Sequence, residues 1–308
     1  MSNRDVVDCL IVGAGPAGLT AGINLRRFFR RVCIVDAGAP RAALIPRSHN
    51  YPGFPEGVTG SGLLKLLNEQ LEANGGRVTP GRVTRLERAA DNDHFIATLD
   101  KGDGGPAESV EARIVLLATG VVDVDPALAG IEALKERRLI HYCPICDGFE
   151  CTDTRIGIVT HGEHGVREAL FMKSYSTNLV LVGVEGDLGL TPKAMAQLER
   201  EDVEIFVGQG RRAYADERGA VHIEMADGRD EAFDALYCAL GTRVRNELAA
   251  ALGVRHDECG YLLVDEHMQT GIEGLYAIGD LSNRLNQLTV ATGQASIAAT
   301  AIHNRLRT

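Results

Sequence analysis

The chain has 308 residues, which is enough for a large hydrophobic core and for two domains. Its 42 acidic residues outnumber its 32 lysine and arginine residues, and the resulting net charge of −10 argues against nucleic acid or an anionic membrane as a partner. We expect no secretory signal and no membrane span, because the sequence contains neither pattern. Of its seven cysteines only one pair is closely spaced, which favours a reducing, cytoplasmic location.

The N-terminal segment has the pattern of a dinucleotide-binding module. A buried strand over residues 6–12 leads into the loop Gly13-Ala14-Gly15-Pro16-Ala17-Gly18, and a helix to about residue 30 and a strand over residues 32–35 follow. Asp36 ends this second strand, eighteen residues after Gly18. In this context the glycines let the backbone approach a pyrophosphate, and the acid binds a ribose hydroxyl.

A loop, a helix and three strands are expected next. The sequence Asn50-Tyr51-Pro52-Gly53-Phe54-Pro55 predicts a rigid loop, and a helix over about residues 61–74 follows it. Residues 77–117 favour three short strands with a turn near residues 100–106. The last strand ends in Ala118-Thr119-Gly120, whose small residues allow a ligand to approach the backbone closely.

The sequence Cys143-Pro144-Ile145-Cys146-Asp147-Gly148 contains two cysteines that can close and open a disulfide ring. Pro144 suits the first position of a helix, so Cys143 faces the positive end of the helix dipole, which favours its thiolate. Asp147 follows the pair directly and is placed to give or accept a proton. The pattern predicts a redox-active dithiol with a proton relay.

The cysteines allow two other interpretations. A zinc site would need further ligands from Cys151, His141, His161 and His164, and their spacing is irregular. Unreactive buried thiols fit the four cysteines that lie inside or beside apolar runs, which are Cys9, Cys33, Cys238 and Cys259. We therefore expect redox chemistry at the closely spaced pair and no metal site.

The strand–loop–helix–strand pattern then repeats. Residues 155–159 predict a strand, Thr160-His161-Gly162-Glu163-His164-Gly165 takes the place of the glycine loop, and a helix to about residue 175 and a strand over residues 178–184 follow. Further strands are expected near residues 203–207, 220–225 and 235–239. The predicted fold class is α/β, with two dinucleotide-binding, Rossmann-like modules in one chain.

The C-terminal part ends in a predicted helix over about residues 287–306. It carries many small residues, which suit tight packing on a neighbouring helix or on a flat ligand, and both interpretations stay open. These small residues are Ala291, Gly293, Ala295, Ala298 and Ala299.

These motifs resemble those of the low-molecular-weight thioredoxin reductases over nearly the whole chain. The matching segments are the N-terminal glycine loop, Asn50 to Pro55, Ala118-Thr119-Gly120, Cys143 to Gly148, Gly279-Asp280 and Gln287. The resemblance implies a three-layer FAD-binding domain of residues 1–120 and 243–308. It also implies that a pyridine-nucleotide-binding-type domain of residues 121–242, which carries the dithiol, is inserted between them. A homodimer with rotating domains is implied as well.

The resemblance assigns roles to individual residues. Cys146 would face the flavin, Cys143 would attack the substrate disulfide, Asp147 would donate the proton, and Asp280 and Gln287 would hold the ribityl chain and the isoalloxazine. The complete set of FAD-binding residues that it implies is Gly13, Gly15, Pro16, Ala17, Gly18, Asp36, Ala37, Asn50, Val83, Ala118, Thr119, Gly120, Gly279, Asp280, Gln287 and Leu288.

The sequence departs from that family at the predicted nicotinamide nucleotide site. Thr160 and His161 stand where the loop needs small residues, and a Cβ there hinders the approach of a pyrophosphate. Where the family places a His-Arg-Arg cluster, the chain reads Gly183-Val184-Glu185-Gly186-Asp187, with two anions and no cation. NADPH is therefore expected to bind poorly. NADH stays open, because Glu185 lies about where a ribose-binding acid would sit.

This departure resembles two offshoots of the family. One comprises thioredoxin-reductase-like flavoproteins that do not use pyridine nucleotides, some of which take electrons from ferredoxin. The other comprises FAD-dependent dithiol oxidases, which form disulfides in small molecules and pass electrons to O₂.

The sequence thus predicts an FAD-dependent thiol–disulfide oxidoreductase that works without NADPH. Electrons would pass between the flavin, the Cys143–Cys146 disulfide and an external substrate, either a thioredoxin-like protein or a small dithiol. The direction of transfer stays open, so ferredoxin as donor and O₂ as acceptor are both retained. A flavin-binding redox sensor or partner protein is the alternative from a different class.

Overall fold

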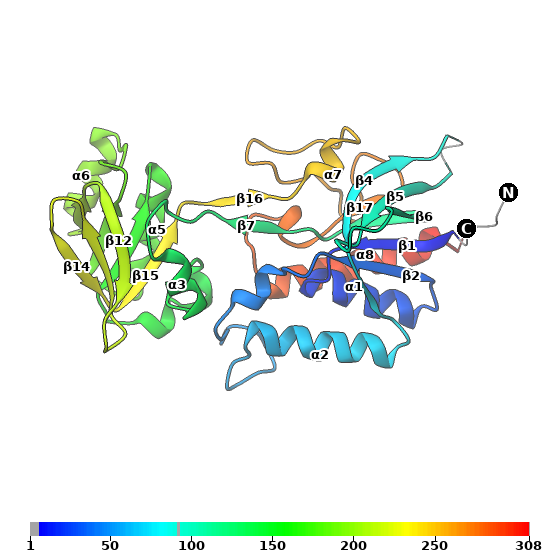
Figure 1. The fold of residues 1–308 in the computed structure, drawn as a ribbon, viewed down its shortest axis with the longest axis horizontal. Coiled ribbons are helices and arrows are strands. Elements are labelled where there is room, and N and C mark those ends of the chain that lie inside the picture. The colour runs from blue at the N-terminus through cyan, green and yellow to red at the C-terminus, as the bar shows by residue number, and fades with distance from the viewer. Residues whose placement is uncertain (1–5, 91–92, 308) are drawn as a thin grey trace. The chain divides into compact units, whose positions relative to one another are not determined.

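The computed structural model describes residues 6–90 and 93–307, which form two compact units (Figure 1). The first unit comprises Met1–Arg47, Val58–Val122 and Arg243–Thr308, and the second comprises Ser48–Gly57 and Asp123–Thr242. Two of the connections between the units are β7 (Val121–Asp123) and β16 (Thr242–Val244), which pair as a two-stranded sheet. Within the described residues, no helix is both long enough and apolar enough to cross a membrane.

The first unit is built on a seven-stranded sheet in the order β3-β2-β1-β6-β5-β4, with β17 pairing with β6. Strands β1, β2, β3, β6 and β17 are parallel, whereas β4 and β5 run antiparallel to their neighbours. The bounds are β1 Val7–Val12, β2 Val32–Asp36, β3 Val78–Pro80, β4 Arg82–Arg88, β5 Phe95–Asp100, β6 Glu108–Leu117 and β17 Leu275–Ala277. The sequence predicts one strand fewer between residues 77 and 117, because β3 and β4 are separated by a single residue, Gly81.

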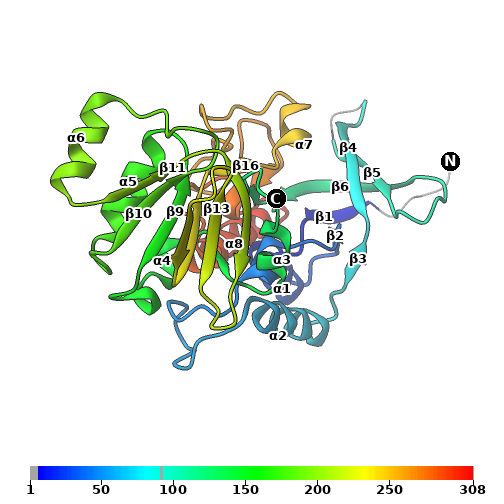
Figure 2. The ribbon, with the colours of Figure 1, turned by 60° about the vertical axis from the view of Figure 1, so that its left-hand side comes forward.

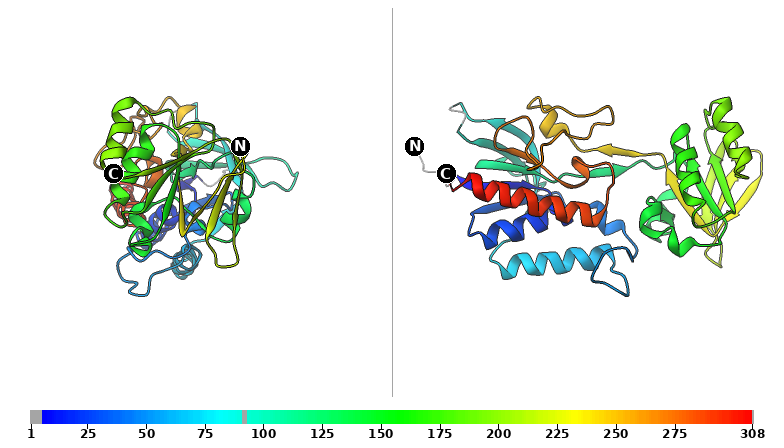
Figure 3. Two further views of the ribbon diagram at one scale, coloured as in Figure 1. Left: turned by 90° about the vertical axis from the view of Figure 1, so that its left-hand side faces the viewer. Right: turned by 180° about the vertical axis from the view of Figure 1, so that it is seen from behind.

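Three helices lie side by side along one face of this sheet, as the rear view in Figure 3 shows. They are α1 (Pro16–Arg27), α2 (Gly60–Ala73) and α8 (Leu288–Arg305). The shorter helices of the unit are η1 (Arg41–Leu44), α7 (Glu247–Ala250) and η3 (Gly279–Leu281). Helix α1 ends earlier than predicted, and Phe29 just after it has a φ of 60°, which a continuing right-handed helix does not allow.

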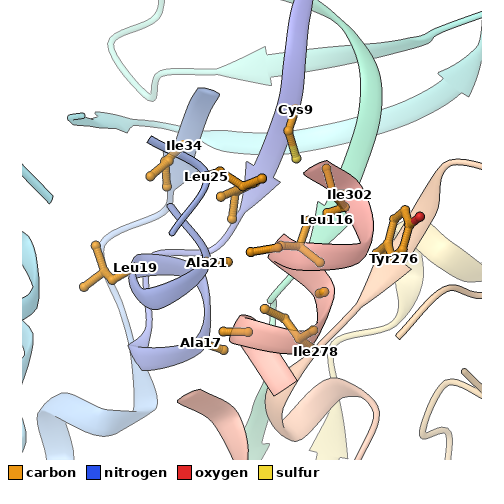
Figure 4. Close-up of a cluster of buried hydrophobic side chains, with 14 of the residues drawn as sticks. Cys9, Ala17, Leu19, Ala21, Leu25, Ile34, Leu116, Tyr276, Ile278 and Ile302 are labelled. Carbon is orange, nitrogen blue, oxygen red and sulfur yellow. The ribbon is translucent and has the colours of Figure 1, made fainter. Parts of the chain in front are cut away.

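The small residues of α8 form a packing face. Ala295, Ala298 and Ala299 are fully buried in a core cluster that also contains Ala17 and Ala21 of α1. Figure 4 shows Ala17 and Ala21 on the side of α1 that faces α8. Small side chains let the two helix backbones approach closely, so the helix-packing interpretation is confirmed for these positions.

The second unit has a five-stranded parallel sheet in the order β11-β10-β9-β15-β8 and a three-stranded antiparallel sheet, β12-β13-β14. The strand bounds are β8 Ile140–His141, β9 Ile156–Thr160, β10 Leu179–Gly183, β11 Glu204–Val207, β12 Gly210–Ala215, β13 Val221–Met225, β14 Asp230–Phe233 and β15 Ala235–Ala239. The helix bounds are α3 Ile131–Glu136, α4 Pro144–Asp147, η2 Phe149–Cys151, α5 Glu163–Met172 and α6 Pro192–Arg200.

Alternating residues on the central strands explain the three layers of this unit. Ile158 and Leu181 pack with α5 and α6 on one face of the parallel sheet, whereas Val180 and Val182 pack against Ile223 of the antiparallel sheet on the other. Figure 2 shows α5 and α6 on one side of β9 and β10, and β13 on the other. The five residues of each of β9, β10 and β15 are buried, as expected for parallel strands covered on both faces. The predicted α/β class with Rossmann-like sheets is confirmed.

Candidate functional site

Cys143 and Cys146 are joined as a disulfide, with their Cα atoms 5.3 Å apart. Cys143 is the N-cap of α4 and Pro144 its first residue, as predicted, and the backbone N–H of Cys146 donates to the Cys143 carbonyl at 2.9 Å. Both cysteines are partly exposed, so a substrate sulfur can reach them. Helix α4 has only four residues, so its dipole contributes less to thiolate stability than the sequence suggested.

Asn50 supports the turn between the two cysteines. Its Nδ2 donates to the carbonyl of Ile145 at 3.1 Å, and its Oδ1 accepts from the Ser48 hydroxyl at 2.7 Å. The segment Ser48–Gly57 belongs to the second unit, together with the dithiol. Asn50 thus belongs to a different unit from the other predicted FAD-binding residues, and its role toward FAD stays a prediction.

Both oxygens of the Asp147 carboxylate are engaged by aromatic side chains. Oδ2 lies 2.6 Å from Nδ1 of His141, and Oδ1 accepts from the Tyr237 hydroxyl at 2.6 Å. The two rings stack with centroids 4.9 Å apart. His141 and Tyr237 are register partners on the adjacent parallel strands β8 and β15, and this pairing brings both side chains to Asp147. The carboxylate beside Cys146 is therefore held by two ring groups.

Sequence reasoning missed this role for both aromatic residues. The sequence indicated His141 only as a possible zinc ligand. Its position two residues before Cys143 could have indicated a role beside the dithiol. Tyr237 lies 90 residues from Asp147 in the sequence and carries no local motif. Among the described residues, no group of three or more histidine, cysteine or acidic side chains is placed to hold a metal ion.

The other cysteines divide into two kinds. Burial raises the pKa of Cys9, Cys33 and Cys151 and raises that of Cys238 to about 12, which keeps these thiols protonated and unreactive. Cys259 is exposed, so its prediction as a buried thiol was wrong. It lies in a turn closed by the Asp257 carboxylate, which holds the Cys259 backbone at the surface rather than in the core.

The N-terminal glycine loop has the close backbone contacts that its motif predicts. A Cβ on Gly13, whose φ is +108°, would lie 2.3 Å from the Ala118 carbonyl oxygen, and a Cβ on Gly18 would lie 1.9 Å from that of Gly13. A Cβ on Gly15 would meet nothing within 4 Å, so this backbone faces open space at the N-cap of α1. Within the described residues, the first turn of α1 has neither a side-chain cap nor an acidic residue. This end of α1 therefore fits a pyrophosphate.

The other predicted FAD-binding residues of the first unit lie at the ends of its strands and helices. Asp36 ends β2, where its carboxylate accepts from the backbone N–H groups of Ala14 at 2.6 Å and Gly38 at 2.7 Å. Asp280 follows β17, and its Oδ2 lies 3.3 Å from an Arg41 guanidinium nitrogen. The remaining members are Pro16 and Ala17 at the start of α1, the exposed Ala37, the buried Val83 of β4, Ala118, Thr119 and Gly120 after β6, Gly279 in η3, Gln287 at the N-cap of α8, and Leu288.

Two further contacts bear on the fit to FAD. The Thr119 hydroxyl donates to the Arg245 carbonyl at 2.7 Å, and the Arg245 N–H donates to the Gly120 carbonyl at 3.0 Å, which fixes the turn after β6. Beside Gln287, Oδ1 of Asn286 is buried without a protein partner in the described part of the chain. A buried acceptor costs free energy unless a donor pairs with it, so this oxygen fits a polar ligand.

Replacing Gly18 with alanine should displace the glycine loop, because the new Cβ would overlap the Gly13 carbonyl. We expect a loss of about 1–3 kcal/mol in unfolding free energy and loss of bound FAD, measured by thermal unfolding and by the flavin-to-protein absorbance ratio. Gly293→Ala is the matched control, since Gly293 also lies in a helix and its Cβ would meet nothing within 4 Å. That variant should keep its FAD and gain about 0.5–1 kcal/mol. Equal FAD content in the two variants would contradict the assignment of the loop.

The corresponding loop of the second unit is filled by the protein itself. A Cβ on Gly165 would lie 2.2 Å from Cγ2 of Thr160, so the Thr160 side chain occupies the space below the loop, and its hydroxyl donates to the Ala239 carbonyl at 2.9 Å. The Gly162 N–H donates to the Leu188 carbonyl at 2.7 Å. The chain after β10 therefore closes onto the N-terminus of α5.

Acidic side chains surround this second loop. Glu163 lies in the first turn of α5, where its carboxylate accepts from the Thr191 hydroxyl at 2.9 Å. Glu185 and Asp187, in the segment after β10, are exposed. The N-terminus of α5 thus carries its own anion, in contrast to the open N-terminus of α1.

Comparisons with known proteins agree on the relatives of this chain. The sequence pattern of the pyridine nucleotide-disulphide oxidoreductases matches residues 7–295. A thioredoxin reductase of Listeria monocytogenes is 26% identical over 96% of this chain and 93% of its own length, and one of Mycoplasmopsis pulmonis is 28% identical over 100% of both. The crystal structure of a thioredoxin reductase from Streptococcus pyogenes has a TM-score of 0.87 and 26% identity, and the match covers 99% of both chains.

Proposed function

Since the chain belongs to the pyridine nucleotide-disulphide oxidoreductase family, we propose that it exchanges electrons between FAD, the Cys143–Cys146 disulfide and an external thiol or disulfide without using NADPH. It is a thioredoxin-reductase-like enzyme whose cofactor is FAD. The observation that carries the proposal is the partly exposed disulfide, with Asp147 next to Cys146 in the sequence and its carboxylate held by His141 and Tyr237. The inserted-domain boundaries, the cytoplasmic location and the homodimer stay predictions.

The first unit would hold FAD mainly at the N-terminus of α1. The N–H groups of this open helix end would bind the pyrophosphate, Asp36 would bind the adenosine ribose, and Asp280 would bind the ribityl chain. Bound FAD supplies two-electron redox chemistry toward the dithiol. A Cβ on Gly120 would meet nothing within 4 Å, so this position leaves room for a ligand close to the backbone, and its positive φ is one that glycine accommodates.

The second unit would perform the exchange with substrate. A substrate thiolate attacks the Cys143 sulfur, the Cys143–Cys146 bond breaks, a mixed disulfide forms on Cys143, and Cys146 leaves as a thiolate that takes up a proton. The same steps in reverse reduce a substrate disulfide. The partly exposed position of α4 supports a substrate that brings its sulfur to the surface, which a thioredoxin-like protein or a small dithiol can do.

The closed second loop supports the exclusion of NADPH. A pyrophosphate needs free N–H groups and a positive helix end. Here the Gly162 N–H is taken by Leu188, and Glu163 occupies the first turn of α5. Electrons would then come from or go to another partner, and reduced ferredoxin and O₂ are the two partners that the resemblance suggests.

Anaerobic mixing tests the proposed function. The FAD-loaded, oxidised protein is mixed in turn with dithiothreitol, reduced thioredoxin and reduced ferredoxin, and the visible flavin absorbance is followed. We expect at least one dithiol to bleach the flavin. Admission of O₂ then tests whether the reduced flavin is reoxidised fast enough for turnover. Flavin that stays oxidised with both dithiothreitol and reduced thioredoxin would overturn the proposal. A conformational change without turnover would instead indicate a redox sensor.

A further inference from the structure

We propose that His141 and Tyr237 are positioning residues for the exchange reaction: Tyr237 fixes one oxygen of Asp147, and His141 supplies and recovers the proton that passes through the other oxygen. This inference rests on the proposed function. Its basis is the convergence of both rings on one carboxylate beside Cys146, with contacts of 2.6 Å to each oxygen.

Tyr237 is suited to hold a fixed donor. Its side chain is 2% exposed, and its hydroxyl lies 3.6 Å from Sγ of the buried Cys151. Burial, and after it the Asp147 carboxylate, raise the pKa of Tyr237 far above its ordinary value. The phenol therefore keeps its proton and donates to Oδ1 of Asp147 throughout the working pH range. Proton exchange is left to the other oxygen.

His141 is the partner of that other oxygen. An imidazole ordinarily titrates near pH ~6.5, whereas an aspartate carboxyl titrates near ~3.9. A hydrogen-bonded imidazole and carboxylate can share one proton, which then belongs to the pair. His141 is about one-fifth exposed, so it can exchange this proton with water.

The proton balance is complete within the exchange step. A substrate thiolate forms a bond to Cys143 while the Cys143–Cys146 bond breaks, and the departing Cys146 sulfur takes the proton from the His141–Asp147 pair. The pair then takes a proton from water, which restores it. No oxidant beyond the enzyme disulfide and no reductant beyond the substrate thiol is required.

The other ionisable groups on the elements next to α4 lie on η2 and α5. On η2 they are Glu150 and the buried Cys151, whereas the two cysteines at α4 are joined as a disulfide and do not titrate. On α5, which contacts α4, His164 and Glu168 pair with each other at 3.6 Å. Among the described groups, His141 is the only one that forms an ion pair with Asp147.

The variants His141→Asn and Tyr237→Phe separate the two roles. Asparagine places an amide donor near the position of Nδ1 but does not titrate, so only Asp147 can then hold the proton. The rate of disulfide reduction in His141→Asn should fall at neutral pH. The alkaline limb of the rate–pH profile, where the rate declines, should move about two units toward acid. Phenylalanine keeps the ring but removes the donor to Oδ1. The carboxylate then binds its proton more tightly, and the limb should move up to about one unit toward alkali.

The measurement is the rate at which dithiothreitol reduces the Cys143–Cys146 disulfide in the FAD-loaded protein. Samples are quenched in acid and alkylated, and mass spectrometry then gives the fraction of protein whose disulfide has been reduced. Each rate is divided by the fraction of dithiothreitol that is thiolate at that pH, which removes the reagent's own pH dependence. The chain offers a matched control: His222 lies 2.8 Å from Asp230 and stacks on Tyr214, whose hydroxyl donates to the same carboxylate at 3.1 Å. His222→Asn and Tyr214→Phe should leave the rate–pH profile unchanged, because this group lies on β12–β14 and its hydrogen bonds go to Asp230 rather than to Asp147.

Opposite shifts of the limb in the two variants would support the inference. A profile that keeps the wild-type position in both, with or without a lower rate, would overturn it and leave the proposed function intact. Failure of dithiothreitol to reduce the disulfide of the wild-type protein at any pH would instead overturn the proposed function.

Discussion

Replacing Cys146 with serine is expected to lower electron exchange between FAD and any thiol or disulfide by about 1,000-fold or more, while FAD stays bound. A serine hydroxyl cannot form the S–S bond through which the electrons pass, and Cys146 lies outside the glycine loop that would hold FAD. Single-turnover reduction by dithiothreitol, followed through the visible flavin absorbance, measures the loss.

The companion variants make this result specific. Cys143→Ser should also be inactive, and its remaining Cys146 thiolate should give a long-wavelength absorption band if Cys146 is the sulfur that faces the flavin. The assignment is reversed if the band arises in the Cys146 variant. Cys259→Ser is the control, because Cys259 is an exposed thiol in the first unit and should not affect turnover. Full activity in both variants of the pair would refute its redox role.

NADPH is expected to leave the flavin oxidised, and this is the second large effect. At the α5 loop, Thr160 fills the space near the backbone, and Leu188 takes the Gly162 N–H. At the adenosine end, Glu185 and Asp187 would repel the 2′-phosphate. Each lost charge-assisted hydrogen bond costs about 1.5–3 kcal/mol, so losing two or three weakens binding by roughly two to six powers of ten.

Stopped-flow mixing under nitrogen measures this effect. The same preparation must be bleached by dithiothreitol, which shows that its flavin and dithiol are competent. Bleaching within seconds at sub-millimolar NADPH would refute the expectation. Bleaching by NADH alone would identify a nicotinamide-linked reductase, with Glu185 holding the ribose.

The repeating units of the fold could be predicted because their signals are local. Continuous apolar runs marked β1, β9 and β10, and Pro144 after Cys143 marked the start of α4. The sequence did not indicate β12 or β14. These strands are short and largely polar, and their pairing with β13 depends on the neighbouring sheet that they cover.

The candidate site could be predicted only where its residues are neighbours in the sequence. Cys143, Cys146 and Asp147 form one motif, whereas Tyr237 reaches Asp147 only through the register of β15 with β8. Strand β8 has two residues, too few to show a periodic pattern. In the same way, the substitution at Thr160 was visible in the sequence, but the closure of the following chain onto Gly162 was not.

The contact between Thr160 and Gly165 also ties two sequence positions together. Any side chain at position 165 would lie within 2.5 Å of three Thr160 atoms, and one of them is the Thr160 Cβ, so with this backbone residue 165 can gain a Cβ only if residue 160 is glycine. Removing the threonine in turn leaves a buried gap and frees the Ala239 carbonyl that its hydroxyl now binds. Opening the loop by substitution at residue 160 is therefore expected to lower the stability of the second unit. The effect of a substitution at residue 165 depends on residue 160, so the two positions are epistatic.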